Sequence, residues 1–366
     1  MRAALLQAPG QPFELVDDVE IDDPKTGEVR VRVSHCGVCH SDLSIADGAF
    51  PAPTPIILGH EAAGFVDAVG PGVTSLAPGD PVVLTPCPPC GRCYGCVRGE
   101  PGVCANVLGM MTSALPDGRT GLSRKGGTIY RGVNLAAFSE YVVLQETGAV
   151  KVAADVPLDV VCVIGCAVQT GVGAVLNTAR VEAGASVLVL GLGGIGLSIV
   201  QGARIAGAAR IVVSDPVAKR RAAARAFGAT DLLDPATDDV LQAARDLTGG
   251  IGIDYAFESA GRAALIQTAL GAVRNGGTVV CVGAPPISES IVIPLAAGFV
   301  ISEKKLLGCT LGSSNSLREI PRLIALWRAG RLDLEALITS RRPLAEINQA
   351  MDDLRASRGI RTVLAV

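Results

Sequence analysis

Residues 186–198 read Ser186-Val-Leu-Val-Leu-Gly-Leu-Gly-Gly-Ile-Gly-Leu-Ser198 and carry the strongest structural signal in the chain. The apolar run Val187–Leu190 is typical of a buried parallel strand. Glycines follow in the spacing Gly-x-Gly-x-x-Gly, which permits a tight turn and the close approach of a pyrophosphate, and a helical pattern begins behind them. The N-terminus of such a helix offers N–H groups and a partial positive charge to an anion. The stretch therefore predicts a dinucleotide-binding turn with the candidate cofactor-binding residues Gly191, Gly193, Gly194, Ile195 and Gly196.

A second strand and an acidic residue follow at the distance that this kind of turn requires. Ile211–Val213 is apolar, and Asp215 stands 19 residues after Gly196. An acidic residue there is placed to bind the 2′-hydroxyl of a ribose, so we expect NAD rather than NADP, whose 2′-phosphate it would repel. Arg220 is a further candidate cofactor-binding residue. It belongs to the basic run 219–221, whose positive charges could reduce the repulsion between Asp215 and the 2′-phosphate of NADP. An ordinary role for Asp215 at a strand end is the alternative.

The second half of the chain repeats this alternation of strands and helices. Apolar runs recur between helical segments at residues 186–190, 211–213, 231–233, 253–257 and 278–282. Strands that alternate with helices form βαβ units and a parallel sheet, so we predict an α/β fold with a doubly wound sheet here. The beginning of the chain differs, because apolar and polar residues alternate over short runs, as at Val29, Val31 and Val33, and predict antiparallel strands.

Composition and charge exclude several classes of protein. The net charge of −3 and the lack of a basic cluster give no electrostatic support for nucleic-acid binding. The most apolar window, residues 186–198, is too short and glycine-rich to span a membrane, and the N-terminus lacks the long apolar segment of a secretory signal. We therefore expect a cytoplasmic protein that acts on a small molecule, without a nucleic-acid or membrane partner. The eleven cysteines are mostly clustered, which favours metal binding over disulfides.

The strongest metal signal is a set of four cysteines at steps of 3, 3 and 8 residues: Cys90, Cys93, Cys96 and Cys104. Four thiolates in one short loop can close a tetrahedral shell around zinc with no open position, which is the pattern of a structural site. Reduced surface thiols or disulfides are the alternatives. Cys87 competes for the place of first ligand, but we favour Cys90 because three evenly spaced sulfur atoms fold compactly around a metal.

A second group of potential ligands lies upstream. The chain has only three histidines: His35 and His40 adjoin cysteines, and His60 precedes Glu61. A lone histidine is more often structural, but this concentration favours a metal or redox element. Cys39 closes a Cys-x-x-Cys pair of the kind found in thioredoxin-like sites. We discount that function because no βαβ pattern flanks the pair.

These motifs together resemble the zinc-dependent medium-chain alcohol dehydrogenases, and the resemblance covers nearly the whole chain. The motifs that carry it are Cys39-His40-Ser41-Asp42, Gly59-His60-Glu61-Ala62-Ala63-Gly64, the four-cysteine loop, Ile164-Gly165-Cys166, and Gly191–Gly196 with Asp215. The resemblance implies a mostly-β, GroES-like catalytic domain that binds zinc, formed by residues 1–167 and completed by residues 307–366. A Rossmann domain that binds NAD is expected over residues 168–306.

By position, the resemblance implies that Cys39, His60 and Cys166 bind a catalytic zinc ion. Together with the structural zinc, each chain would then hold two zinc ions. Two thiolates and one imidazole leave a fourth tetrahedral position open for water or a substrate oxygen. Zinc in such a site acts as a Lewis acid, which lowers the pKa of an alcohol and polarises an aldehyde in the reverse direction.

Neighbouring residues take roles by the same resemblance. Ser41 matches the hydroxyl residue that receives the alcohol proton, and Asp42 matches a carboxylate that orients a ligand imidazole. Glu61 is expected beside the metal, and His40 and Arg361 are expected on the cofactor pyrophosphate. Helix capping is the alternative for Ser41 and Asp42, and a solvated surface position is the alternative for His40.

Three positions depart from the better-known pattern of this family. Ser44 stands where some relatives carry the histidine that ends the proton relay, so the proton could leave through water. Pro86 stands where relatives often place a bulky aromatic residue, and it could widen the substrate pocket. Leu108 stands where glutathione-dependent formaldehyde dehydrogenases carry an anion-binding arginine, which argues against a thiol-adduct substrate.

The resemblance also implies an assembly and a reaction. Cys104 and Cys166 are 62 positions apart. This spacing matches the long form of the loop between the four cysteines and the third zinc ligand, and family members with the long form tend to be homodimers. We expect reversible hydride transfer between a primary or secondary alcohol and NAD, giving an aldehyde or ketone. A thiol-dependent formaldehyde dehydrogenase and a non-catalytic protein that binds zinc and a dinucleotide are the alternatives. The second predicts loss of an essential ligand, but all the expected zinc ligands are present.

Overall fold

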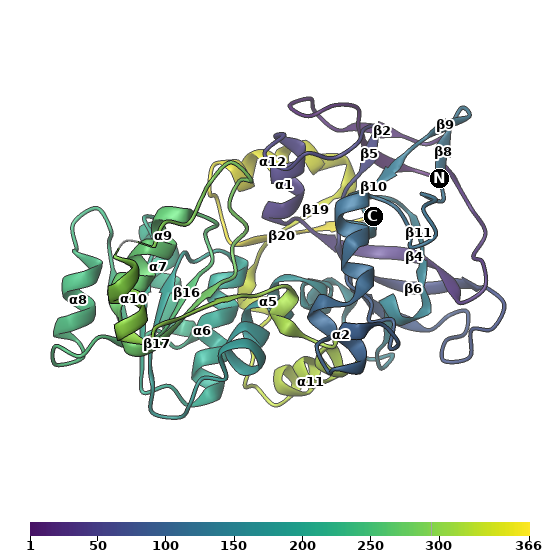
Figure 1. Cartoon of the computed structure of the whole chain (residues 1–366). Coiled ribbons are helices and arrows are strands. Elements are labelled where there is room, and N and C mark those ends of the chain that lie inside the picture. Colours follow the sequence, from purple (N-terminus) through teal and green to yellow (C-terminus); the bar gives the residue numbers. More distant parts are fainter. Residues whose placement is uncertain (294) are drawn as a thin grey trace. The chain divides into compact units, whose positions relative to one another are not determined.

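The computed structural model describes residues 1–293 and 295–366 of the chain. These residues form two compact units (Figure 1), of which the first comprises Met1–Ala167 with Asn315–Val366 and the second comprises Val168–Ser314. The chain returns to the first unit at Asn315 rather than at residue 307. The return comes later because β18 (Lys305–Gly308) pairs in parallel with β17 (Val273–Cys281) and so belongs to the second unit.

The first unit is built mainly of strands. Its largest sheet has seven strands in the order β12-β7-β6-β4-β20-β19, with β11 also paired to β4. The strands of this sheet are β4 (Glu28–Gly37), β6 (Glu61–Val69), β7 (Pro81–Leu84), β11 (Tyr141–Gln145), β12 (Ala149–Lys151), β19 (Ile338–Pro343) and β20 (Arg361–Ala365). Smaller sheets have the orders β10-β5-β1-β2 and β3-β8-β9. Their strands are β1 (Ala3–Leu6), β2 (Glu14–Val16), β3 (Glu20–Ile21), β5 (Ile56–Ile57), β8 (Leu122–Arg124), β9 (Gly127–Thr128) and β10 (Tyr130–Arg131).

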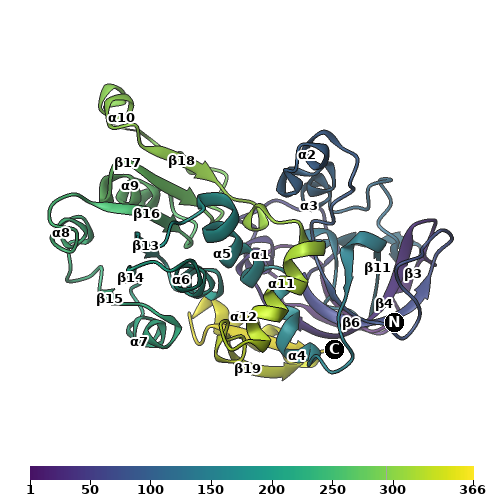
Figure 2. The same cartoon turned by 90° about the horizontal axis from the view of Figure 1, so that it is seen from below.

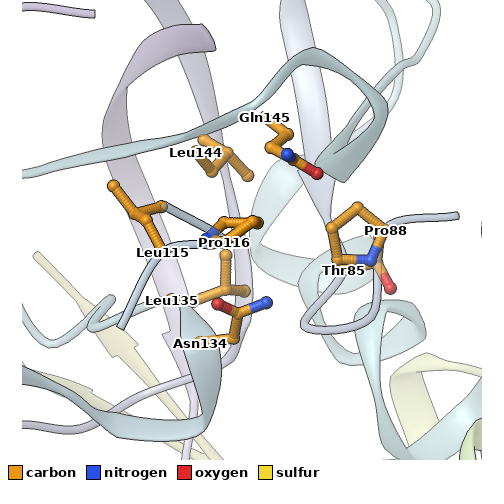
Figure 3. A pocket seen from close by; sticks show the side chains of 8 residues that line it. All are labelled: Thr85, Pro88, Leu115, Pro116, Asn134, Leu135, Leu144 and Gln145. Atoms are coloured by element: carbon orange, nitrogen blue, oxygen red, sulfur yellow. The ribbon is translucent and has the colours of Figure 1, made fainter. Parts of the chain in front are cut away.

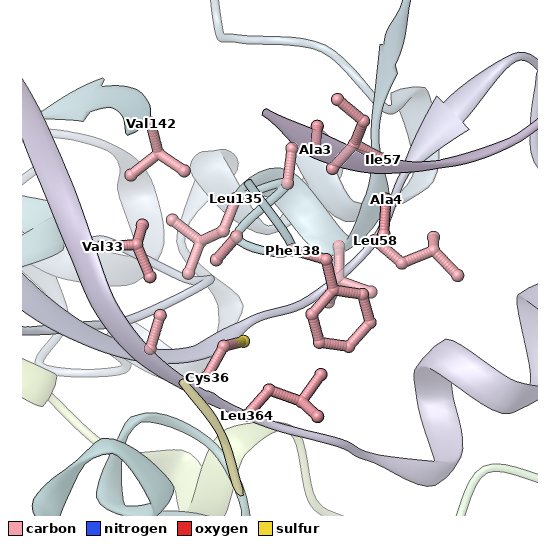
Figure 4. Packing of buried hydrophobic residues seen from close by; sticks show 14 of the residues in the cluster. Ala3, Ala4, Val33, Cys36, Ile57, Leu58, Leu135, Phe138, Val142 and Leu364 are labelled. Carbon is pink, nitrogen blue, oxygen red and sulfur yellow. The ribbon is translucent and has the colours of Figure 1, made fainter. Parts of the chain in front are cut away.

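The core of the first unit gathers the apolar faces of these strands. Val29, Val31 and Val33 of β4 are all buried, as the alternation of their sequence predicted. Phe138 is fully buried and lies close to Cys36 and Leu364 in the cluster that Figure 4 shows. Cys36 is therefore a core side chain of the sheet.

Short helices accompany the strands of the first unit. They are α1 (His40–Ala46), α2 (Tyr94–Val97), α3 (Gly109–Thr112), α4 (Leu158–Val161), α11 (Ser316–Arg328) and α12 (Ile347–Arg355). After α4 the chain continues through a 3₁₀ turn over Cys162–Gly165, then α5 (Ala167–Gly173) and a π-helical segment over Ala174–Ala179.

The break in this helical region falls at Cys166, whose backbone angles (φ −135°, ψ −77°) are not helical. Gly165 permits the break, because a Cβ atom there would lie 2.2 Å from the carbonyl oxygen of Leu84. The apolar periodicity continues through the break, so the periodicity alone does not reveal it.

The second unit contains a parallel sheet of six strands in the order β15-β14-β13-β16-β17-β18. Besides β17 and β18, its strands are β13 (Ser186–Leu190), β14 (Arg210–Ser214), β15 (Asp231–Leu233) and β16 (Ile253–Glu258). The prediction of a doubly wound α/β sheet is thus confirmed. Figure 2 shows the strands side by side in this order.

Helices cover both faces of this sheet. They are α6 (Gly194–Ala206), α7 (Ala218–Phe227), α8 (Val240–Asp246) and α9 (Ala263–Ala272), whereas α10 (Ala296–Ser302) precedes β18 and has no buried residue. The chain passes from β13 to β14 in one direction across the sheet and from β16 to β17 in the other. Because such crossovers are right-handed, α6 and α9 pack on opposite faces. The direction reverses between β13 and β16, which is the point where sheets of this kind bind their ligands.

In the part of the chain that the structure describes, no single helix is both long and apolar enough to cross a membrane. One bent pair of helices, Leu158–Gly165 with Ala167–Ala179, meets the criteria of length and composition together.

Candidate metal centres and dinucleotide-binding turn

Four potential metal ligands from distant parts of the sequence meet inside the first unit. Cys39 precedes α1, His60 and Glu61 stand at the start of β6, and Cys166 lies in the helix break. One ligand atom from each lies within 4.8 Å of the others, and all four residues belong to a buried group. The structure therefore brings together the three residues that the sequence predicted as ligands of a catalytic zinc, with a carboxyl group beside them.

The chain can present His60 because of the glycine before it. Gly59 has φ of +93°, and a Cβ atom there would lie 2.6 Å from the backbone nitrogen of Phe138. A larger residue would meet both a strained backbone and a clash. Gly59 therefore sets the path by which the chain enters β6 and places the imidazole in the core.

Asp42 orients two of the predicted ligands. Its carboxylate is fully buried, and its Oδ1 accepts hydrogen bonds from Nδ1 of His60 (3.0 Å) and from the backbone N–H of Gly59 (2.9 Å). Its Oδ2 accepts from the backbone N–H of Cys39 (3.1 Å), which also closes a capping box at the start of α1. The sequence offered imidazole orientation and helix capping as alternatives for Asp42, and the geometry supports both at once.

The donor set fits a metal ion. Because Nδ1 of His60 donates to Asp42, its Nε2 is the lone-pair atom, and this atom is buried without a hydrogen-bond partner among the described residues. Two sulfur atoms and one imidazole nitrogen are ligands that zinc prefers, and three protein ligands leave a fourth position open. Cys39, His60 and Cys166 would therefore hold a zinc ion of the catalytic type.

The electrostatics of the site also favour a cation. A hydrogen bond with Cys166 holds the pKa of the Cys39 thiol well below its usual range, so Cys39 tends to be a thiolate. Burial raises the pKa of Glu61 to about 8. The pKa of His60 is raised because the charges of Asp42 and Cys39 outweigh the opposing effect of burial.

Arg361 and Glu61 lie against each other beside these ligands. Nε of Arg361 lies 3.4 Å from Oε2 of Glu61, and Nη1 of Arg361 donates to the carbonyl oxygen of Val38 (2.6 Å). Oε1 of Glu61 accepts from the backbone N–H of Ala167 (3.2 Å). Arg361 is only 5% exposed, so its guanidinium shares the buried surroundings of Glu61. Contact of Arg361 with a cofactor pyrophosphate stays a prediction.

The remaining predicted residues of this site lie on the first turn of α1. Oγ of Ser41 is 3.9 Å from Sγ of Cys39, and the Ser41 side chain is half-buried. His40 is exposed at the first position of the helix, and Ser44 is half-buried one turn further on. Ser41 and Ser44 share a face of α1, since residues three apart are neighbours on a helix.

The four-cysteine loop forms a second candidate metal centre in the same unit. The sulfur atoms of Cys90, Cys93, Cys96 and Cys104 lie within 4.8 Å of one another. Backbone N–H groups point at these sulfur atoms: Cys93 donates to Cys90 Sγ and Cys90 donates to Cys104 Sγ, each at 3.3 Å. Such donors stabilise thiolates, and backbone N–H groups of Cys96 and Ala105 hold the pKa of Cys93 at about 6. Four thiolates fit a closed structural zinc site.

Cys87 lies outside this group. It is buried with its Sγ 3.4 Å from Sδ of Met110, and burial raises its pKa to about 12. Its sulfur atom is not among the four that lie within 4.8 Å of one another. The geometry therefore supports Cys90, and not Cys87, as the first residue of the cluster.

Figure 3 shows a small cavity lined in part by Thr85 and Pro88, which precede the four-cysteine loop in the sequence. It is lined by Thr85, Pro88, Leu115, Pro116, Asn134, Leu135, Leu144 and Gln145. Its volume of about 10 Å³ has room for no more than one water molecule, so it is not a substrate pocket. Nδ2 of Asn134 donates to the carbonyl oxygen of Pro86 (2.9 Å), and Nδ2 of Asn106 donates to that of Pro88 (2.8 Å). These amides anchor the segment that carries Pro86. The side chain of Leu108 lies outside the described part of the structure.

The glycine-rich stretch of the second unit forms the expected turn between β13 and α6. Gly191 has φ of +94°, and its N–H donates to the carbonyl oxygen of Ser214 (2.9 Å). Gly193 caps α6, which begins at Gly194, and Ile195 is half-buried in its first turn. A Cβ atom at Gly196 would lie 2.0 Å from the carbonyl oxygen of Gly191. The turn can therefore close only with glycine at this position.

Asp215 is bound to this turn. Its Oδ2 accepts from the N–H of Leu192 (2.7 Å), and its Oδ1 accepts from the N–H of Val217 (2.8 Å). Arg221 donates from Nη1 to the carbonyl oxygen of Asp215 (2.6 Å) and pairs through Nη2 with Asp234 (2.5 Å). The ion pair of Arg221 with Asp234 is a feature that sequence reasoning missed, because nothing in the spacing of the two residues marks it. Arg220 is half-buried next to it in α7.

The chain matches two family models. Residues 25–154 match the alcohol dehydrogenase GroES-like domain, and residues 194–326 match the zinc-binding dehydrogenase model.

Solved structures match the chain over its full length. An alcohol dehydrogenase zinc-binding domain protein from Burkholderia ambifaria is 36% identical, with a TM-score of 0.94, and the match covers 100% of this chain and 98% of that one. Benzyl alcohol dehydrogenase from Acinetobacter calcoaceticus is 32% identical, with a TM-score of 0.93 and coverage of 100% and 99%. A structure from Sinorhizobium meliloti 1021, described as a zinc-binding dehydrogenase bound to NADP, is 27% identical, with a TM-score of 0.81 and coverage of 100% and 99%.

Proposed function

The chain belongs to the zinc-dependent medium-chain alcohol dehydrogenase family, and we propose that it transfers hydride reversibly between a primary or secondary alcohol and NAD. The products would be an aldehyde or ketone and NADH. The observation that carries this proposal is the buried group of Cys39, His60 and Cys166, in which Nε2 of His60 lacks any other partner among the described residues. We assign one catalytic zinc ion to this group and one structural zinc ion to the four-cysteine loop.

Residues of the first unit would each have a separate role in binding and activating the alcohol. Zinc, when bound, supplies a Lewis acid that lowers the pKa of the alcohol and polarises the carbonyl group in the reverse direction. Asp42 fixes the imidazole and the Cys39 backbone, so the ligands need no reorganisation during turnover. Arg361 keeps a positive charge against Glu61 within the same buried cluster.

Ser41 would take the alcohol proton as hydride leaves the alcohol carbon for the nicotinamide ring. Its hydroxyl group can accept this proton while passing its own onward. Ser44 follows on the same face of α1, and water completes the path to solvent in place of the histidine that some family members carry. Proton release is thus expected to depend on a hydroxyl and water relay.

The environment of Asp215 favours NAD over NADP. A 2′-phosphate at this point would meet the carboxylates of Asp215 and Asp234, and the Arg221 guanidinium between them is already bonded to both residues. The relative from Sinorhizobium meliloti carries NADP, so the preference needs a direct measurement. We expect kcat/KM to be higher with NAD. Equal or higher efficiency with NADP would refute this role of Asp215.

Aryl alcohols are the substrates to test first. The support is the 32% identity over the full chain to a benzyl alcohol dehydrogenase, together with a proline at position 86 where a bulky side chain would narrow a pocket. The experiment is an initial-rate screen of aliphatic and aryl alcohols, with and without glutathione. Turnover of free alcohols supports the proposal, whereas a strict requirement for a thiol would favour a formaldehyde dehydrogenase instead.

A homodimer is supported by the surface of the second unit. β18 is an edge strand that pairs only with β17 in the described sheet. Close to it in the sequence, Leu295, Val300 and Ile301 are 84%, 72% and 81% exposed. An open edge next to exposed apolar side chains favours pairing with a second copy of the chain.

No cysteine among the described residues is in a disulfide, which fits a reducing compartment, so we assign the reaction to the cytoplasm.

A further inference from the structure

Glu258 is a buried acidic residue of the second unit that the proposed reaction does not use. It ends β16 and stands opposite Leu190 of β13 and Cys281 of β17. Its side chain is fully buried. The direction of the sheet reverses between β13 and β16, so Glu258 lies at the strand ends where sheets of this kind bind ligands. Burial of a carboxyl group is costly unless it is hydrogen-bonded, so its partners indicate its role.

The carboxyl group holds the segment that follows it. Its Oε1 accepts hydrogen bonds from the backbone N–H groups of Ala260 (2.9 Å) and Arg262 (3.2 Å). Arg262 is the N-cap residue of α9 and makes no capping bond with its own side chain. Glu258 therefore satisfies amides that the helix start leaves open, and it folds the segment Ser259–Arg262 back over the end of β16.

This segment in turn contacts the glycine-rich turn. Oγ of Ser259 donates to the carbonyl oxygen of Gly191 (2.9 Å), and its backbone N–H donates to that of Leu190 (2.9 Å). A Cβ atom at Gly191 would lie 3.0 Å from Cβ of Ala260, and one at Gly196 would lie 2.9 Å from Oγ of Ser259. With so little free space, a shift of the segment would move the turn.

The second carboxyl oxygen is enclosed. Oε2 of Glu258 has no hydrogen-bond partner among the described residues. A Cβ atom at Gly283 would lie 2.9 Å from Oε2 and 2.2 Å from the backbone nitrogen of Gly261. Burial raises the pKa of Glu258, and the charge of Glu289 adds to the effect, which favours the neutral acid. A neutral group can keep its Oε1 bonds without the cost of a buried charge.

We propose that Glu258 and Ser259 are positioning residues, which hold the glycine-rich turn in the shape that accepts a dinucleotide. The inference rests on the proposed function, because it takes Gly191–Gly196 as the turn that binds NAD. It predicts that these side chains control the affinity for the cofactor and leave the rate of hydride transfer nearly unchanged.

The test is calorimetric titration of the zinc-loaded, full-length protein with NADH, combined with steady-state kinetics. Removal of both Oε1 bonds in Glu258→Leu should raise the Kd for NADH and the KM for NAD about tenfold, while kcat at saturating NAD changes less than about twofold. Glu258→Gln keeps an acceptor oxygen and should stay within about twofold of wild type in Kd. Asp254→Leu is the matched control, since Asp254 lies in the same strand and accepts bonds from Ser186 and Arg274. It should leave the Kd unchanged.

Three results would overturn the inference: a wild-type Kd in Glu258→Leu, equal weakening in Glu258→Gln, or equal weakening in Asp254→Leu. If Glu258→Leu does not fold, Ser259→Ala decides, because it removes only the hydroxyl bonds to the carbonyl oxygens of Leu190 and Gly191 and keeps the backbone bond. This variant should raise the Kd severalfold, and an unchanged Kd would refute the proposal. A wild-type protein that binds no NADH would instead refute the proposed function, so the two failures are distinguishable.

Discussion

At the scale of single residues, Asp42 connects the start of α1 to the metal ligands. One carboxylate accepts hydrogen bonds from the Cys39 backbone, the Gly59 backbone and the His60 ring, so a helix cap and a ligand orienter are the same side chain. A buried carboxylate that serves three donors from different segments cannot move toward one of them without weakening its bonds to the others. The position of His60 therefore depends directly on Asp42.

Asp42→Asn should lower zinc affinity or activity by about 10–100-fold, because one acceptor oxygen becomes an N–H₂ group that faces a donor. The measurement is kcat together with zinc content after dialysis against a weak chelator. Asp47→Asn is the matched control. Asp47 ends the same helix at an exposed position and pairs with Arg355. Equal behaviour of the two variants would contradict the orienting role of Asp42.

At the scale of elements, two short segments depend on one residue type each. The turn between β13 and α6 has room only for glycine at position 196. The four-cysteine loop is held around a cluster of sulfur atoms instead of a hydrophobic core. A metal shell supplies folding energy to such a loop, since the loop has few apolar side chains of its own to bury.

Gly196→Ala should weaken NADH binding roughly tenfold or more, because the new methyl group would lie against the Gly191 carbonyl oxygen and force the turn open. The zinc content should stay at the wild-type value, since both metal centres lie in the first unit. Titration with NADH and elemental analysis of the same sample check both statements. Normal NADH affinity in this variant would contradict the assignment of the turn.

Cys90→Ala should remove one zinc ion per chain and make residues 85–112 sensitive to limited proteolysis, because three thiolates no longer close the shell. Cys87→Ala is its control, since Cys87 is a buried neighbour outside the sulfur cluster. It should keep its full zinc content. Loss of zinc from Cys87→Ala, with retention in Cys90→Ala, would reverse the ligand assignment.

At the scale of the whole molecule, the open edge at β18 and the apolar residues near it predict association. Ile301→Asp should convert a dimer into monomers, because an exposed apolar residue at an interface would become a buried charge. Sedimentation velocity at several concentrations measures the change. Ile251→Asp is the control, as Ile251 is 70% exposed at a turn before β16. A wild-type protein that sediments as a monomer at all concentrations would refute the dimer.

The same scale shows what the sequence can and cannot reveal. The turn at Gly191–Gly196 and the four-cysteine loop were predictable, because the chemistry of each lies within a few neighbouring residues. The break at Cys166 and the bonds of Glu258 were not, because they depend on partners such as Leu84 and Ala260 whose places only the folded chain defines. The domain boundary predicted at residue 307 lies at Asn315 in the structure for a similar reason. β18 is half-exposed and lacks the apolar run that marked the other strands.

The proposal for the whole molecule is zinc-dependent oxidation of an alcohol by NAD, and metal removal tests it most directly. NADH formation from benzyl alcohol is followed with the purified protein, then after removal of the zinc ion that we assign to Cys39, His60 and Cys166, and again after zinc is returned. The account predicts turnover that disappears with the metal, returns with it, and is absent from Cys39→Ala. Turnover that continues at the same rate without zinc, or in Cys39→Ala, would contradict it.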